Sequence, residues 1–111
     1  MSYDNENIFA KILRSEIPCD KIYEDEYILS FRDINPQAKI HALIIPKEQY
    51  IDIVDFLQNA NAKYQTNFWA SVNTIIDNLD LRDRGFQIKT HKGKDGGQEV
   101  FHFHLHLLSN S

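Results

Sequence analysis

The stretch VFHFHLHLL, at residues 100–108, alternates apolar side chains with three histidines. Successive side chains of a β-strand point to opposite faces, so His102, His104 and His106 are expected on one face. The other face then carries apolar side chains that we expect to be buried: Phe101, Phe103, Leu105 and Leu107. This period of two predicts a closing strand that covers the core with one face and presents imidazoles on the other.

The first half of the chain contains one helical pattern followed by strand-like runs. Apolar residues at helical spacing predict a short helix over residues 8–13, which Asn7 caps and Pro18 ends. Alternating and β-rich runs predict three strands, at residues 21–25, 27–34 and 41–47. Pro36 disfavours helix at the residue before it, so residues 34–39 are expected to form a loop.

The second half of the chain contains the long amphipathic helix. Its apolar stripe consists of residues at helical spacing: Tyr64, Phe68, Val72, Ile75, Ile76 and Leu79. A further strand is predicted at residues 86–91, a loop rich in glycine and lysine at residues 92–98, and a separate helical turn within residues 51–61. Short links between strands predict an α+β fold in one domain, residues 1–111: a mostly antiparallel five-stranded sheet with one long and one short helix.

Composition and charge exclude several classes of function. The chain has 111 residues and a net charge of −4, which argues against binding to nucleic acid because such proteins need a basic face. No segment has the apolar length of a membrane span or the features of a signal peptide. The single cysteine, Cys19, forms no internal disulfide, which fits a reducing compartment. We therefore expect a cytoplasmic protein without membrane or nucleic-acid partners.

Three explanations other than catalysis apply to the histidine face. A solvated strand face accounts for one histidine more readily than for three in strict alternation, and a purification tag would be contiguous. A metal site meets a geometric obstacle, because a rise of about 3.3 Å per residue separates the backbones of His102 and His106 by about 13 Å. No Cys-x-x-Cys pair or acidic ligand lies nearby in the sequence. We therefore expect no metal.

Catalysis explains the pattern better. A neutral imidazole is a competent nucleophile at about pH 7, and a second imidazole can act as acid or base. Two adjacent histidines of one face, about 7 Å apart at the backbone, can straddle one electrophilic centre. Just before them, Gly93, Gly96 and Gly97 allow backbone N–H groups to converge on anionic oxygens. The combination predicts a phosphorus centre attacked by histidine.

The run HFHLHLL resembles the His-φ-His-φ-His-φ-φ signature (φ, apolar) of the histidine triad superfamily. Three longer blocks are similar, in the same order, to histidine triad nucleotide-binding proteins: IFAKILRSEIP, FRDINPQAKIHALIIPK and DGGQEVFHFHLHLL. Residues 51–81 match only as a helix. The resemblance implies a HIT-like fold, a homodimer whose sheets join into one, and hydrolysis of purine nucleoside phosphoramidates and acyl adenylates. We expect no cofactor.

Four histidines match the catalytic positions of that family. His104 resembles the nucleophile that takes the nucleotidyl group, and His106 would contact the α-phosphate beside it. His102 corresponds to the first triad residue, which orients the nucleophile, and His41 would support the triad from another strand. The implied reaction displaces an amine or carboxylate from the α-phosphorus. It leaves a nucleotidyl-histidine, which water hydrolyses to a nucleoside monophosphate such as AMP or GMP.

Further positions match nucleotide contacts of the family. Asp33 corresponds to the acidic residue that holds the ribose hydroxyls, although an aspartate before Asn35-Pro36 is also a common turn residue. Phe9 and Ile34 resemble walls of the base pocket, and either would otherwise be assigned to the core. Phosphate contacts are expected from the glycine-rich loop, through Gly97, Gln98, Glu99 and Val100 and above all through the backbone amides of residues 98–100.

Several positions depart from the family pattern. His91 stands where many relatives have Asn, and we expect it to reach the phosphate or to cap the loop. Glu99 replaces a small hydroxyl residue and is expected to point outward. Lys89, Lys92 and Lys94 either attract a nucleotide or form a solvated edge. Arg32 either favours a longer polyphosphate or is an exposed strand residue. Members usually continue past the triad strand, which leaves the leaving-group preference open.

Two competing functions stay open. The first is hydrolysis of dinucleoside polyphosphates, in which another branch of the superfamily commonly has Gln before the triad and Arg after it. Phe101 and Leu108 stand at those positions here, which argues against this reading. The second is nucleotide binding with little activity. The presence of all four family histidines argues against it. The preference for adenosine or guanosine is open.

Overall fold

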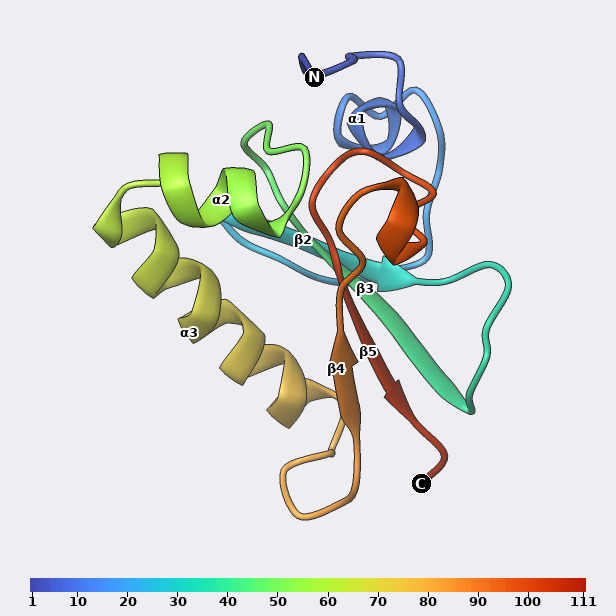
Figure 1. Cartoon of the computed structure of the whole chain (residues 1–111). Helices are drawn as coiled ribbons and strands as arrows, with labels where there is room; N and C mark the ends of the chain where they lie inside the picture. Colours follow the sequence, from blue (N-terminus) through green and yellow to red (C-terminus); the bar gives the residue numbers. More distant parts are fainter.

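The computed structural model describes all 111 residues. One antiparallel sheet runs through the molecule with the strand order β1-β2-β3-β5-β4 (Figure 1). Its strands are β1 (Lys21–Glu24), β2 (Ile28–Arg32), β3 (Ile40–Pro46), β4 (Gln87–Lys89) and β5 (Leu105–Ser109). The helices are α1 (Ile8–Leu13), α2 (Ile53–Asn59) and α3 (Ala62–Asn78), with a 3-10 turn at Lys94–Gly96. The predicted α+β fold is confirmed, with a second short helix, α2, where a helical turn was expected.

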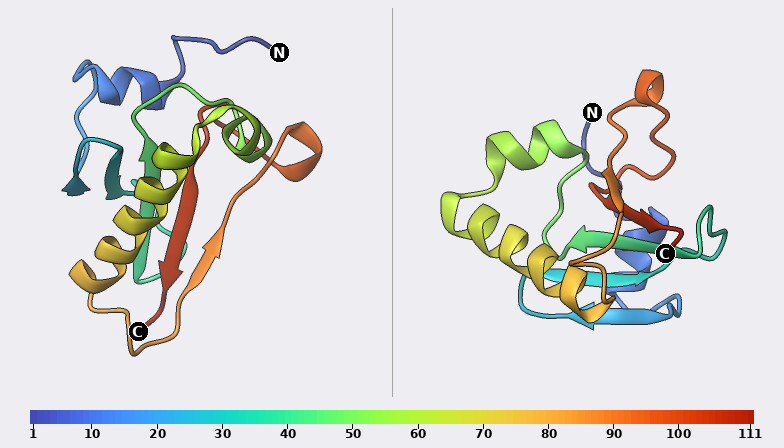
Figure 2. Two further views of the ribbon diagram at one scale, coloured as in Figure 1. Left: turned by 90° about the vertical axis from the view of Figure 1, so that its left-hand side faces the viewer. Right: turned by 90° about the horizontal axis from the view of Figure 1, so that it is seen from below.

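The sheet separates two hydrophobic clusters. The larger cluster joins one sheet face to α2 and α3, with Phe56, Phe68 and Phe103 fully buried at its centre. The smaller cluster lies on the opposite face under α1, where Phe9 meets Phe31 edge-on with ring centroids 5.6 Å apart. Figure 2 shows α3 on one side of the sheet and α1 on the other. The alternation of side chains along β2 and β3 supplies both clusters.

Helix α3 forms as the apolar stripe predicts. Its 17 residues begin after Asn61, whose side-chain oxygen accepts a hydrogen bond of 2.8 Å from the amide of Tyr64. Tyr64, Phe68, Val72 and Ile75 are buried against the sheet. No helix of the chain combines the length and the apolar composition needed to cross a membrane.

The predicted closing strand is partly wrong. The ladder with β3 covers only Leu105–Ser109, and residues 100–104 run without strand pairing. Contacts outside the sheet hold this segment instead: the Phe103 amide donates to the Tyr50 carbonyl at 2.7 Å, and the Thr90 hydroxyl donates to the His104 carbonyl at 2.7 Å. Phe101 is therefore only partly buried and lies outside the core clusters. The strand predicted at residues 86–91 is likewise shorter, as β4 shows.

Candidate active site

A cavity of about 580 Å³ opens beside α1 on the sheet face that carries the smaller cluster. Ten of the twelve residues predicted for the site line it: Phe9, Asp33, Ile34, His41, His91, Gly97, Glu99, Val100, His104 and His106. The two exceptions are His102 and Gln98. Apolar lining residues that the motif did not indicate include Ile12 and Ile17 near α1 and Leu43 of β3. Helical spacing from Phe9 indicates Ile12, and strand alternation indicates Leu43, whereas Ile17 lies outside any helix or strand and has no local signal.

Strand register explains why residues distant in the sequence meet here. In the β3–β5 ladder, Leu43 faces His106 and His41 faces Leu108. His41 and His106 are therefore diagonal neighbours on one sheet face, close enough for their rings to touch. The ring centroids lie 5.2 Å apart. Asp33 follows β2 directly, and its amide donates to the His41 carbonyl at 3.0 Å, which places its carboxylate beside both rings.

His104 lies just before β5 and is only 6% exposed. Its Nδ1 lies 2.7 Å from the carbonyl oxygen of His102. A carbonyl can only accept a hydrogen bond, so Nδ1 carries the proton and Nε2 carries the lone pair. Nε2 has no hydrogen-bond partner, and no buried side-chain nitrogen in the chain lacks one, so Nε2 is accessible. The ring of Phe9 packs edge-on against the imidazole at a centroid distance of 4.9 Å.

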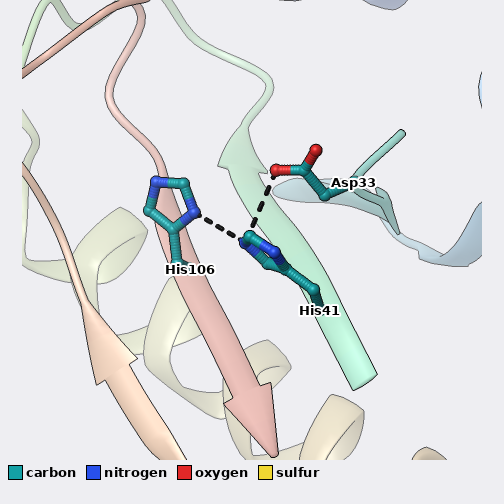
Figure 3. Close-up of side chains that lie close together, drawn as sticks. All are labelled: Asp33, His41 and His106. Atoms are coloured by element: carbon teal, nitrogen blue, oxygen red, sulfur yellow. Dashed lines mark hydrogen bonds and ion pairs between the residues drawn. The ribbon is translucent and has the colours of Figure 1, made fainter. Parts of the chain in front are cut away.

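The hydrogen bonds of His41 determine which nitrogen of His106 carries the proton (Figure 3). The amide N–H of Gln37 donates to Nδ1 of His41 at 3.1 Å, so the single proton of the neutral His41 ring is on Nε2. That Nε2 lies 2.9 Å from Nδ1 of His106 and 3.4 Å from a carboxylate oxygen of Asp33. His106 Nδ1 is therefore the acceptor, and its Nε2 carries the proton. Of the two neighbouring triad rings, His104 thus offers a lone pair to the cavity and His106 offers an N–H.

Burial keeps these rings neutral. Desolvation lowers the pKa of His104 and of His41 below the ordinary value for histidine. Burial lowers the pKa of His106 to about 4, helped by repulsion from the neighbouring histidines when they are charged. The rings of His41, His104 and His106 are therefore unprotonated at neutral pH, as a nucleophile requires.

The imidazole of His102 does not face the cavity. Its Nε2 donates to the Pro46 carbonyl at 2.9 Å, and its Nδ1 accepts from the Tyr3 hydroxyl at 2.5 Å. The contact that His102 makes with the His104 ring therefore comes from its backbone carbonyl, while its own ring holds residues 100–104 against the core. Tyr3 was missed by sequence reasoning, since it lies 99 residues away and carries no motif.

The side chain of Gln98 also turns away from the cavity. It is 6% exposed and makes three hydrogen bonds: to the carbonyls of Ile51 at 2.7 Å and Val100 at 3.0 Å, and from the amide of Gly93 at 2.8 Å. Its polar side-chain atoms are already engaged, so the phosphate contact expected at Gln98 stays a prediction for its backbone amide. The Gln98 side chain stabilises the glycine-rich loop, so a ligand could contact this residue only through its backbone.

The rim of the cavity carries charges of both signs. Lys89 and Glu99 line it, and Glu99 is exposed at the opening, as expected for an outward-pointing carboxylate. Lys92 lies 3.9 Å from Asp52, and Lys94 is exposed on the 3-10 turn, so neither faces the cavity. Arg32 borders the cavity but lies 3.6 Å from the carboxylate of Asp20. Cys19 also lines the wall, and burial raises the pKa of its thiol.

Asp33, His41 and His106 bring three possible ligand atoms within 4.8 Å of one another, a spacing that a metal ion could use. The ligand atom of His41 would be Nε2, which carries the proton. Binding a metal there would move that proton to Nδ1, where it would meet the Gln37 N–H. Two donors would then face each other. The cluster therefore suits a hydrogen-bonded relay better than a metal centre.

Comparison with known proteins agrees with this geometry. The family model of the HIT domain matches residues 14–111. An uncharacterized HIT-like protein of Rickettsia prowazekii is 41% identical over 106 residues, covering 96% of this chain and 88% of the relative. The purine nucleoside phosphoramidase of Escherichia coli K12 is 35% identical over 106 residues, covering 93% and 86%.

A solved structure of a HIT family hydrolase from Clostridium thermocellum superimposes with a TM-score of 0.87 at 34% identity. The match covers 97% of this chain and 93% of that one. The motif, the five-stranded sheet and the histidine cluster between β3 and β5 agree with this match. This chain belongs to the HIT domain family.

Proposed function

We propose that the protein is a hydrolase that cleaves purine nucleoside phosphoramidates or acyl adenylates at the α-phosphate. The observation that carries this proposal is the pair of cavity-facing rings. His104 offers an accessible lone pair on Nε2, and the proton of His106 is on its own Nε2, with ring centroids 5.0 Å apart. A nucleophile and a hydrogen-bond donor side by side match attack on a phosphorus whose oxygens need stabilisation.

The reaction proceeds in two balanced steps. Nε2 of His104 forms a bond to the α-phosphorus as the bond between phosphorus and the leaving group breaks; an amine leaves with a proton taken from solvent, and an acyl group leaves as a carboxylate, which needs none. A water molecule then attacks the nucleotidyl-histidine and loses a proton to solvent, the phosphorus–nitrogen bond to His104 breaks, and a nucleoside monophosphate departs. During the first step the His102 carbonyl stabilises the positive charge that develops on the His104 ring, because Nδ1–H donates to it at 2.7 Å.

The rest of the cavity accommodates a nucleotide. Phe9 and Ile34 provide apolar surface for a base. Ile34 is 87% exposed, so its side chain is free to contact a bound base. One Asp33 oxygen already accepts the Asn35 amide at 2.8 Å, which orients the carboxylate and leaves the other oxygen for ribose hydroxyls. The backbone from Gly97 to Val100 borders the same cavity and would contact the phosphate, with the buried Gln98 side chain holding it in place.

Similarity to the Escherichia coli phosphoramidase supports the substrate class, and similarity to the Clostridium thermocellum hydrolase supports the reaction class. Dinucleoside polyphosphates are a less favoured class, because Arg32, the nearest candidate for an additional phosphate, is already close to Asp20. No resident cofactor is needed in this scheme, since the four histidines supply the nucleophile, the donor and their support.

A homodimer through joined sheets is part of the proposal. Strand β4 pairs with β5 on one side and is the free edge of the sheet on the other (Figure 2). Two large apolar side chains on β4 and just before it are exposed: Phe86 at 38% and Ile88 at 39%. An edge strand beside exposed apolar side chains is suited to pairing with a second copy.

The experiment that tests the function compares three substrates in the presence of a chelator. They are an adenosine phosphoramidate with a fluorescent amine, its guanosine counterpart, and diadenosine tetraphosphate. Wild type is measured beside His104→Ala. Cleavage of the phosphoramidates that disappears in the variant, with nucleotide binding retained, is the expected result. Faster cleavage of the tetraphosphate would assign the competing hydrolase function, and wild-type rates in His104→Ala would refute the mechanism.

A further inference from the structure

The chain has five histidines, and His91 is the one that lies outside the triad motif and is not His41. It also lines the cavity. It follows β4 by two residues and precedes the glycine-rich loop. Its ring meets the ring of His106 edge-on, with centroids 5.4 Å apart. The left-handed backbone of Gly97, with φ of 83°, brings the loop against this ring. His91 is thereby placed next to the N–H that the proposed mechanism aims at the α-phosphate.

The loop fixes which nitrogen of His91 is protonated. Nδ1 lies 2.8 Å from the carbonyl oxygen of Gly96, which can only accept. The proton of the neutral ring is therefore on Nδ1, and Nε2 carries a lone pair. Nε2 has no partner within the chain, and since no buried side-chain nitrogen lacks one, this atom is accessible.

A neutral His91 cannot contact a phosphate through Nε2, because a lone pair and an anionic oxygen are both acceptors. A second proton changes this, since a protonated ring donates from both nitrogens and adds a positive charge. The Gly96 carbonyl stabilises that state through Nδ1–H. An asparagine at this place would donate to a phosphate at any pH, so a histidine makes the contact conditional.

We infer that His91 binds the α-phosphate only after taking up a proton, so that the affinity for a phosphate-bearing nucleotide rises as the pH falls. This inference rests on the proposed function, because it places the phosphate beside His106. His91 acts as a pH-dependent specificity residue that distinguishes phosphate-bearing ligands from uncharged nucleosides.

The charges that face His91 come from every neighbouring element. His106 contacts its ring directly, and the other charged or titratable residues that line the same cavity are Cys19, Arg32, Asp33, His41, Lys89, Glu99 and His104. Burial lowers the pKa of the three other cavity histidines, His41, His104 and His106.

The test measures binding of the methyl ester of AMP, whose phosphodiester keeps one negative charge throughout. For wild type we expect the affinity to rise about tenfold between about pH 8 and about pH 5.5, the equivalent of a shift of one unit in the pKa of one group. Calorimetry in buffers of different ionisation enthalpy is expected to detect proton uptake on binding. In His91→Asn, binding persists while the pH dependence and the uptake disappear.

Adenosine serves as the control ligand, because it lacks the phosphate and is expected to bind wild type without proton uptake. Proton uptake that persists in His91→Asn would assign the proton to another histidine and overturn the inference. Binding of the ester with an affinity independent of pH would overturn it as well, while leaving the proposed function intact. No binding of the ester by wild type at any pH would refute both.

Discussion

Nε2 of His41 lies 2.9 Å from Nδ1 of His106, and the amide of Gln37 determines the direction of the hydrogen bond between them. The amide can only donate, so each ring in turn is left with one possible tautomer. A backbone group outside the triad thereby decides that His106 presents an N–H to the cavity. The His102 carbonyl has the opposite effect on His104. It accepts from Nδ1–H, so the cavity-facing Nε2 carries no proton.

Replacing His41 by Ala should lower kcat rather than raise KM. Nδ1 of His106 would lose its donor, and the ring would spend part of its time with the proton on the wrong nitrogen. Loss of such a supporting hydrogen bond typically lowers activity about 10- to 100-fold. Steady-state kinetics with the adenosine phosphoramidate check this. An unchanged kcat with a raised KM would show that His41 binds substrate instead of supporting His106.

Replacing Asp33 by Asn should weaken recognition of the ribose. The variant is expected to lose about tenfold in kcat/KM with an adenosine substrate, as removal of a charged hydrogen-bond acceptor generally does. The same variant should lose little with a 2′-deoxyadenosine substrate, which lacks one hydroxyl. The comparison of both substrates on both proteins is a double cycle. Equal losses with the two substrates would indicate that Asp33 acts through His41 and not on the ribose.

Tyr3→Phe should destabilise the protein without removing any packing area. The change leaves Nδ1 of His102, a fully buried residue, without its donor, and an unsatisfied buried acceptor costs about 1–3 kcal/mol. Chemical denaturation measures the loss in the free energy of unfolding. Tyr27→Phe is the matched control, because the Tyr27 hydroxyl makes no hydrogen bond while its ring packs against Tyr64. Similar losses in both variants would contradict the assigned bond.

Acid should destabilise the fold through His102. Burial lowers the pKa of His102 to about 4, whereas the unfolded chain binds this proton at a higher pH. The unfolded state therefore holds more protons in between, and stability falls as the pH falls. For one such group the loss is about 2 kcal/mol between about pH 6.5 and about pH 5. Denaturation at several pH values measures the slope, which His102→Asn should reduce; an equal slope in the variant would assign the effect to other groups.

The sequence by itself determined most of the helices and strands and the side chains that could carry out chemistry. The apolar stripe of α3, the capping residues Asn7 and Asn61, and the alternation along β2 and β3 are local patterns, and local patterns fix local conformation and the face that is buried. The spacing HFHLHLL likewise places histidines near a glycine-rich loop without knowledge of any distant contact.

Only the tertiary structure decided which nitrogen of each histidine carries the proton and which ring faces the cavity. The tautomers are set by the carbonyls of Pro46, Gly96 and His102 and by the amide of Gln37. The ring of His102 is held inside the core by the hydroxyl of Tyr3, which is 99 residues away in the sequence. Strand periodicity would have placed His102 beside His104 and His106 in the cavity. It fails there because residues 100–104 leave the ladder to satisfy hydrogen bonds with Tyr50 and Thr90. Such partners are brought together by chain folding, so no pattern within the segment encodes them.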